Sequence, residues 1–423
     1  MANEGELFGT VGDILRENPV LPGEGVPEPA VERTLPARLD GQPEFPEPGI
    51  YFGMPEDVYH SINAFSASGA KALSVSSMDW WAGSVLNPER EDDESKFKAL
   101  GRAYHVRICE GASVYALRYA TGLDKADYPD ALVSTDDLIS AIIEAGHTPV
   151  SRIETGQMKP APTQKEPDRM KPVTRAAKKE DLVAQLLDIA PDAQIWDVLQ
   201  AQHAAAHEGR TFINAKQNRR IEIAARMIEN DPDLRKAFID GHAEVAIFWF
   251  DERTGCPMKA KLDYLKLAAI VDLKSFSNPF GRPVNRAIDF TISGQKHYIG
   301  VVVYTQAVEA AKRLIRKHGA SVVHWCDPVL DKPDDLEAWC LRLAKVKDQP
   351  TALWVYQQTG AAPVTRGRIQ VRGTVYTVTA GGVDALKKRY VECTKAFGTD
   401  PWLDIQPITE TTDEDIPLSA TDF

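Results

Sequence analysis

The sequence predicts an α/β protein in which a central mixed β-sheet is flanked by helices. Apolar residues recur with the period of two typical of strands in "AEVAIFWF" (243–250), "CPMKAKLDYL" (256–265) and "AAIVDLKSF" (268–276). A helical pattern precedes these stretches at 196–240, and one long helix is predicted after them at 284–318. Strands framed by helices on both sides indicate an α/β or α+β core, and we expect the α/β arrangement.

Length and composition fit a protein with a sizeable core. The chain has 423 residues, 43% of them hydrophobic, which suits one large domain with attachments or two to three domains. No apolar run approaches the ~20 residues of a membrane span, and the acidic start "MANEGELFGTVGDILRENP" lacks the features of a signal peptide. Five cysteines without close pairs indicate reduced thiols. These features predict a cytoplasmic protein without a membrane partner.

The net charge of −12 is unevenly distributed. Residues 1–48 carry ten acids and three bases, and residues 400–423 carry seven acids and no base. Each end therefore has a charge of −7, which leaves +2 for residues 49–399. Acidic ends around a near-neutral body leave room for a local basic surface, so the net charge does not exclude a nucleic-acid partner.

The first part of the chain is expected to change from an extended segment to helices. Many prolines lie in 18–49, so the acidic N-terminus 1–48 is predicted to be flexible. One helical segment is predicted within 66–88, which has a Ser-rich start and a proline stop, and another at 97–111. Residues 49–120 would thus form an N-terminal helical part.

Residues 121–200 are predicted to be an insertion. Segment 149–175 has five prolines and six Lys or Arg residues, a composition typical of a basic flexible linker. Helical patterns with capping-type starts lie on either side of it, "STDDLISAIIEAG" (134–146) and "AKKEDLVAQLLDIAP" (177–191). Together they resemble the two helices of a small SAP-like or helix-extended-loop-helix DNA-binding element. Two unrelated surface helices would give the same pattern.

The remaining elements of the core are expected near the C-terminus, within 201–399. Three further strands are predicted: "TALWVYQQ" (351–358), "RGRIQVRG" (366–373) and "TVYTVTA" (374–380). A last helix is expected at 382–398, before the acidic tail 400–423. Residues 320–350 carry no functional signal.

Asp272 and Lys274 raise the first question about chemistry. They point to the same face of a strand, and an exposed ion pair there would contribute only ~0–1 kcal/mol. If the strands on either side of Leu267 and Ala268 form a hairpin, Asp263 lies opposite Asp272, with Cβ atoms ~4.5–5.5 Å apart. A divalent cation would relieve the repulsion, and Mg²⁺ prefers oxygen ligands. Lys274 could then orient a water molecule and stabilise charge on phosphorus.

Several segments, in order, resemble one family. The pattern Asp-x8-Asp-x-Lys, from "KLD" and "DLK", resembles the signature of PD-(D/E)xK nucleases. "GRAYH" (101–105) is similar to the Gly-x-Ala-x-His motif of the RecB-type branch, and "HAEVAIFWFDERTG" (242–255) to a core strand of RecE-like exonucleases. The segments 49–73 and 400–418 also resemble the start and end of RecE-like phage proteins. Order and spacing agree across about residues 49–310.

The resemblance implies a restriction-endonuclease-like core and a metal-dependent DNA exonuclease. Asp263, Asp272 and His105 would hold Mg²⁺, or alternatively Mn²⁺, Glu244 would complete or adjust the metal shell, and Lys274 would position the water. The enzyme would resect one strand of linear double-stranded DNA from 5′ to 3′, exposing a 3′ single strand for recombination by strand annealing. Implied partners are double-stranded DNA ends, a RecT-like annealing protein and further copies of the chain, in the host cytoplasm if a phage encodes it.

One motif departs from the family pattern. The family carries Gln-x-x-x-Tyr on the helix after the lysine, whereas this chain has "SGQKHYIGVVVYTQA". Aligning on Tyr304 places Gly300 where the glutamine is expected. Gln295 is nearby and could serve instead, with Tyr298 or Tyr304 as the tyrosine. We therefore include Gln295, Tyr298 and Tyr304 among the candidate site residues.

Three other functions stay open at this point. The chain could be a single-strand or flap nuclease of the same superfamily. It could be a DNA-end-binding protein with a degenerate site, which only the missing helix glutamine favours. It could also be a binding module built around the basic linker, with a purely structural core. The intact Asp263, Asp272 and Lys274 favour an enzyme.

Overall fold

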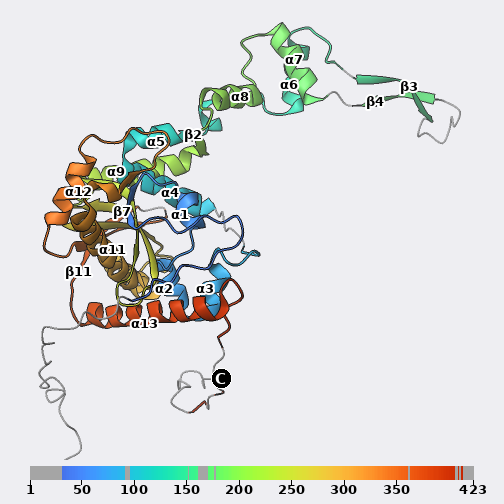
Figure 1. Cartoon of the computed structure of the whole chain (residues 1–423). Coiled ribbons are helices and arrows are strands. Elements are labelled where there is room, and N and C mark those ends of the chain that lie inside the picture. Colours follow the sequence, from blue (N-terminus) through green and yellow to red (C-terminus); the bar gives the residue numbers. More distant parts are fainter. Residues whose placement is uncertain are drawn as a thin grey trace, which may run out of the picture.

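The fold is built on a seven-stranded mixed sheet, seen in a computed structural model of the chain (Figure 1). The structure describes residues 31–90, 96–150, 152–160, 170–175, 178–360, 363–404, 408 and 411–412. In sheet order the strands are β11 (Thr365–Gln370), β10 (Thr351–Gln358), β8 (Ala269–Phe276), β7 (Pro257–Lys266), β6 (Gly241–Phe250), β1 (Gly49–Phe52) and β9 (Val323–Trp325). The predicted α/β class is confirmed.

The directions and the register of the strands in the predicted hairpin agree with the sequence prediction. β10 is parallel to β8 and β9 is parallel to β1, whereas the other neighbours are antiparallel. In the β7–β8 hairpin Tyr264 pairs with Val271 and Leu265 with Ile270. This register centres the hairpin between residues 267 and 268, as predicted, and makes Asp263 and Asp272 the next opposed positions.

Helices cover both faces of the sheet. On one face α11 (His297–His318) packs against α2 (Ala67–Leu73), α12 (Leu336–Lys345) and α13 (Thr374–Phe397), and together they enclose the main hydrophobic core. On the other face α9 (Ala215–Asn230) packs through Ala225 and Ile228 against buried residues of β7, β8 and β10. α11 presents apolar residues on most of its circumference, such as Val301, Val302 and Val303, because it lies in the centre of its layer.

The N-terminal helices agree with the second predicted segment, 97–111, but divide the first. They are α1 (Glu56–Ser61), α2, α3 (Ser77–Gly83), α4 (Lys96–His105), which continues as a π-helical turn at Val106–Glu110, and α5 (Ala112–Arg118). The helical segment predicted within 66–88 is divided into α2 and α3. The division lies at Ser76, whose side chain accepts a hydrogen bond from the Asp79 N–H (2.9 Å) and so caps a new helix.

The single long helix predicted at 284–318 is also wrong, because it is two helices. α10 (Val284–Gly294) ends at Gln295, and α11 begins at His297. Lys296 between them has a left-handed φ of 50°, which no helix residue can adopt. The break redirects the chain so that the first turn of α11 faces the sheet.

The strand predicted at 374–380 is wrong, because these residues form the first two turns of α13. Their β-branched side chains favour a strand locally. In the helix, the hydroxyls of Thr377 and Thr379 donate to the carbonyls of Gly373 and Val375, four residues earlier. Tertiary contacts of the later turns, including buried Tyr390, hold the whole segment helical.

Both chain ends contact the body at their inner parts. The flexible segment predicted at 1–48 lies partly outside the described residues, but 31–48 runs along the body: the Thr34 N–H donates to the Gly255 carbonyl (2.9 Å), and Phe45 packs on Phe248. At the start of the acidic tail, Trp402 is buried and stacks on Trp80 with ring centroids 4.0 Å apart. Residues 31–48 of the segment predicted to be flexible are therefore in contact with the body.

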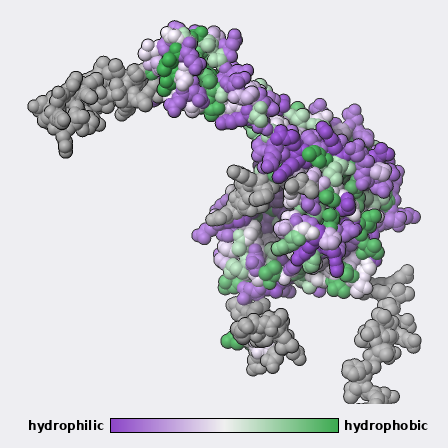
Figure 2. Space-filling view, turned by 180° about the vertical axis from the view of Figure 1, so that it is seen from behind, coloured by the Kyte–Doolittle hydropathy of each residue, from purple (hydrophilic) through white to green (hydrophobic). Residues whose placement is uncertain are grey.

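The insertion projects from the body (Figures 1 and 2). Its base is the two-stranded parallel sheet of β2 (Tyr119–Thr121) and β5 (Thr211–Ile213). Beyond the base lie η2 (Lys125–Asp127), α6 (Thr135–Glu144), α7 (Lys179–Ile189) and α8 (Trp196–Ala206). The predicted linker contains an antiparallel pair of strands, β3 (Arg152–Pro160) and β4 (Met170–Arg175).

The two predicted helices of the insertion pack on each other. Leu138 and Ile142 of α6 share a hydrophobic cluster with Leu182 and Leu186 of α7. They are therefore one structural unit rather than two unrelated surface helices. Ser134 forms the predicted capping box with Asp137 at the start of α6, whereas the start of α7 has no side-chain cap. The short helices η3 (Leu234–Lys236) and η4 (Gly319–Val322) complete the fold. None of the helices in the described ranges is long and apolar enough to cross a bilayer.

Candidate metal and nuclease site

Three carboxylates lie side by side across three adjacent strands. The pairs Ala243–Tyr264 and Val245–Leu262 place Glu244 of β6 beside Asp263 of β7. The β7–β8 register places Asp272 of β8 on the other side of Asp263. Three acids are therefore at one level of the sheet, an arrangement that like-charge repulsion disfavours unless cations compensate it.

The sheet is distorted at this level. Glu244 has a φ of 53°, a left-handed conformation that costs a non-glycine residue of order 1–3 kcal/mol. On the other side, the Leu273 N–H donates to Oδ2 of Asp263 (2.7 Å), so a side chain replaces a backbone acceptor. Both irregularities fix the directions of the Glu244 and Asp263 side chains. Strain that persists at such a cluster is typical of functional sites.

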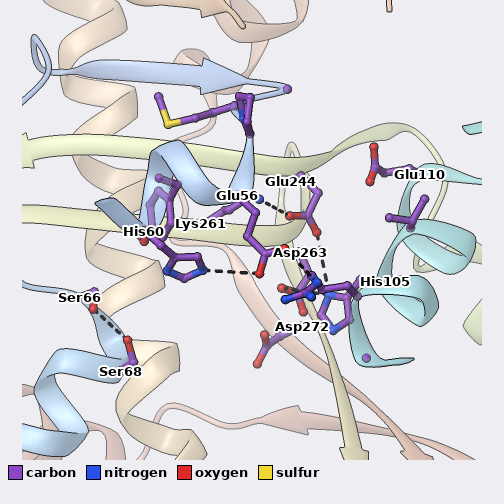
Figure 3. A pocket seen from close by; sticks show the side chains of 18 of the residues that line it. Glu56, His60, Ser66, Ser68, His105, Glu110, Glu244, Lys261, Asp263 and Asp272 are labelled. Atoms are coloured by element: carbon purple, nitrogen blue, oxygen red, sulfur yellow. Dashed lines mark hydrogen bonds and ion pairs between the residues drawn. The ribbon is translucent and has the colours of Figure 1, made fainter. Parts of the chain in front are cut away.

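His105 reaches the carboxylates from the helical layer. It is the last residue of α4, directly before the π-helical turn. Its Nδ1 lies 3.7 Å from Oδ1 of Asp263 and 3.9 Å from Oε1 of Glu244. Figure 3 shows the three side chains pointing toward one another. The Gly-x-Ala-x-His segment and the strands, far apart in sequence, thus meet as predicted.

Two lysines accompany the acids. Lys274 Nζ donates to Oδ1 of Asp272 (2.5 Å), and Lys261 Nζ lies 2.8 Å from Oε2 of Glu244. Asp272 is 5% exposed, so its pair with Lys274 is not the exposed surface pair that the sequence left open. Among the described residues, Asp263 has no lysine or arginine in ion-pair contact, and its ion-pair partner is His105.

The charges shift one another's pKa values. Burial raises the pKa of Asp263 to about 7, although the positive charges of His105 and Lys274 oppose this. Burial alone would lower the pKa of His105, but the negative charges of Asp263 and Glu244 raise it to about 9. Burial would raise the pKa of Glu244, but its hydrogen bonds and ion pairs with His105 and Lys261 lower it to about 2. Asp263 is thus the carboxyl that most needs a further cation.

The cluster lines a cavity of about 640 Å³. Around it, five positively charged side chains from different elements line the same space: Lys71, Arg102, Arg118, Lys261 and Lys274. Some of them are compensated, since Arg118 contacts Glu110 (2.8 Å) and Asp327 (3.0 Å). Burial and the nearby Lys274 lower the pKa of Lys71 to about 8. The cavity therefore offers cationic groups beside an acidic floor.

The helix after the lysine contributes one of its three predicted residues. Tyr304 lines the cavity, and burial together with Asp272 raises its pKa. Tyr298 instead packs against the main hydrophobic core. Gln295 lies at the break between α10 and α11 and does not line the cavity, so it does not replace the missing glutamine. Both residues were predicted for the site from the Gln-x-x-x-Tyr motif that the family resemblance implies.

Other residues of the site were not predicted. Lys261 lies two residues before Asp263 on the same strand, so both side chains point to one face of the sheet. This spacing could have identified Lys261. Lys71 and His297 also line the cavity. They come from α2 and the start of α11, and no local pattern marks them.

The donor set suits a hard divalent cation. His105, Glu244 and Asp263 each offer a ligand atom, and these atoms lie within 4.8 Å of one another. The two carboxylates match the oxygen ligands that Mg²⁺ and Mn²⁺ prefer, whereas the imidazole is a ligand more typical of transition metals. The predicted set named Asp272 with Asp263 and His105; Glu244 takes its place in this closest group, and Asp272 adjoins it, bonded to Lys274.

Comparison of the sequence with protein-family models and with curated proteins gives no match. The fold and the site therefore define the chain: an α/β protein with a mixed seven-stranded sheet and a His-Glu-Asp cluster that could hold a metal ion.

Proposed function

We propose that the chain is a metal-dependent phosphodiester hydrolase that acts on DNA. The observation that supports this most strongly is the row of Glu244, Asp263 and Asp272 beside Lys274 and His105, on the wall of an open cavity. A surface ion network needs neither a left-handed Glu244 nor a buried carboxyl without a lysine or arginine partner. Both features are expected where a cation and a substrate complete the site.

The residues of the site have separate roles in this proposal. His105, Glu244 and Asp263 would hold the cation, with Asp272 adjoining them. A bound cation polarises a phosphoryl oxygen and lowers the pKa of a water molecule. Lys274, held by Asp272, would hold the attacking water in place and place positive charge beside the phosphate. Lys71 and Arg102 would contact backbone phosphates on the way into the cavity.

The narrower function follows the resemblance. A RecE-like exonuclease with a PD-(D/E)xK core would resect one strand of linear double-stranded DNA and expose a 3′ single strand for annealing. Its partners would be a DNA end, a RecT-like annealing protein and further copies of the chain. The cavity is large enough for a nucleotide unit and has cationic side chains on several sides, which is compatible with this substrate.

A cleavage assay tests the proposal. The purified chain is incubated with 5′- or 3′-labelled linear duplex, nicked circle and single-stranded DNA, in Mg²⁺, Mn²⁺ or EDTA. We expect Mg²⁺-dependent degradation of linear duplex only, with one strand removed from its 5′ end. Cleavage of single strands or flaps would support the alternative nuclease, and binding without cleavage would support an end-binding protein. No binding and no cleavage in any metal would refute the proposal.

A further inference from the structure

His297 and Tyr356 form a buried polar pair beside the site. Neither residue has a role in the proposed hydrolysis. Tyr356 lies on β10 at the position paired with Lys274 of β8. Nδ1 of His297 and the hydroxyl of Tyr356 are 2.6 Å apart, and the rings stack with centroids 5.7 Å apart. The pair therefore lies at the same level of the sheet as Lys274.

The backbone directs His297 into the cavity. It is the first residue of α11, directly after the left-handed Lys296. The side chain lines the same cavity as Lys274, although the residue is only 7% exposed. Since Nδ1 is turned to Tyr356, Nε2 is the ring nitrogen left for the cavity.

The hydrogen-bond pattern makes Nε2 a donor. Burial, reinforced by the charges of Lys274 and Lys71, lowers the pKa of His297 to about 4, so the ring is neutral at pH 7. Burial raises the pKa of Tyr356, which keeps its proton. Among the described residues the Tyr356 hydroxyl has no other hydrogen-bond acceptor, so it donates to Nδ1. A neutral imidazole that accepts at Nδ1 carries its proton on Nε2.

Gly300 leaves room for a substrate group next to this donor. It lines the cavity one turn after His297. A Cβ there would meet only Tyr304, at 3.6 Å, so steric crowding does not require glycine. The position at which the family resemblance implies a glutamine is Gly300, which has no side chain, and His297 is the polar group of this helix turn.

We propose that His297 contacts the substrate by donating a hydrogen bond from Nε2 to a phosphate oxygen of the nucleic-acid backbone, with Tyr356 as its positioning residue. The inference rests on the proposed function. The ligand is a phosphodiester group, because a neutral donor next to Lys274 and Lys71 suits an anionic oxygen.

The test compares variants by their Michaelis constants and their DNA affinity. His297→Gln keeps an N–H donor, His297→Leu has similar size without one, and Tyr356→Phe removes only the hydroxyl. Tyr298→Phe is the matched control, since Tyr298 lies on the same helix but packs in the core. Cleavage is measured in Mg²⁺, and binding of a short duplex is measured by anisotropy in Ca²⁺.

We expect His297→Leu to raise KM and the Kd in Ca²⁺ by about tenfold with little change in kcat. The reason is that the lost hydrogen bond stabilises the ground state and the transition state equally. His297→Gln should recover most of the affinity, Tyr356→Phe should lose part of it, and Tyr298→Phe should match the wild type. Equal affinity of the Leu and Gln variants would overturn the inference while wild-type cleavage upholds the proposed function. A wild type without binding or cleavage would overturn both.

Discussion

Two clusters of buried charge in the described part of the chain differ in ways that separate structure from function. In the first, Lys387 of α13 is fully buried and lies 2.6 Å from Asp251 and 2.7 Å from Asp384, which also contacts Arg253. Every carboxylate has a cationic partner, and the cluster ties α13 to the end of β6. It is a closed network whose evident role is to hold elements together.

The second cluster, around Asp263, is open. Asp263 has no lysine or arginine in ion-pair contact within the described ranges, Glu244 is strained, and the side chains line a cavity. Buried charge alone is therefore poor evidence of a site in this molecule. A carboxylate that is paired with a histidine but with no lysine or arginine, a strained backbone and access to a cavity distinguish the second cluster from the first.

The largest expected effect concerns the open cluster. Asp263→Asn should lower Mg²⁺-dependent cleavage by at least about a thousandfold, because it removes a ligand of the cation that stabilises the transition state. Its free energy of unfolding in EDTA should stay equal or rise, since one of three neighbouring acids becomes neutral. Cleavage and chemical denaturation measure the two quantities. A variant that also unfolds would show that the open cluster is structural.

The closed cluster should respond in the opposite way. Lys387→Met leaves Asp251 and Asp384 without their shared cation, and removing one partner of a buried pair costs about 3–5 kcal/mol. Cleavage per folded molecule should be unchanged. Urea denaturation and single-turnover cleavage below the unfolding transition test this. Normal stability with lost cleavage would invert the assignment of the two clusters.

Lys274 tests whether the open cluster needs a compact ammonium group. Lys274→Arg keeps the charge but is a wider, planar group, and a ~1 Å misplacement costs about a hundredfold in rate. We expect Lys274→Arg and Lys274→Ala to bind DNA in Ca²⁺ but to cleave at least about a hundredfold more slowly in Mg²⁺. Near-normal cleavage by the arginine variant would remove Lys274 from the site.

The stability of the two clusters should depend on pH with opposite signs. Burial raises the pKa of Asp263 to about 7, so in EDTA the folded state binds more protons than the unfolded state between about pH 4 and pH 7. The contribution of Asp263 to stability therefore falls as the pH rises through this window.

Burial would raise the pKa of Asp251, but the hydrogen bond and charge of Lys387 lower it. The contribution of Asp251 is thus present above its unfolded pKa of about 3.9 and is lost as the pH falls through the folded value. Comparing wild type with Asp263→Asn and Asp251→Asn by urea denaturation from pH 3 to pH 8 measures both slopes. Slopes of the same sign would contradict the comparison.

The smallest expected effect lies outside both clusters. Deleting the basic segment 149–175 should weaken DNA affinity at low salt and flatten its salt dependence, because fewer phosphates are neutralised. The chemical step should be intact. Binding isotherms at several salt concentrations test this, and an unchanged slope would make the segment a spacer.

Local pattern was sufficient to predict five of the seven strands of the central sheet and part of the site, whereas β1 and β9 were not predicted. Alternation along residues 243–276 gave three strands, and the hairpin register that opposes Asp263 and Asp272 is found in the structure. The break at Lys296 was not predicted, although Gly294, the last residue of α10, lies two residues before it. Gln295 and Tyr298 do not line the cavity, whereas His297, which was not predicted, does.

The most direct test is the binding of Mn²⁺ by isothermal titration calorimetry to the wild type, Asp263→Asn and Asp251→Asn. All three proteins have buried carboxylates, but only the wild type and Asp251→Asn keep every residue of the open cluster. We predict that the wild type and Asp251→Asn bind Mn²⁺ with similar affinity and that Asp263→Asn has lost this binding. Equal binding by Asp263→Asn, or no binding by a folded wild type, would contradict the assignment of the open cluster as a metal-dependent site.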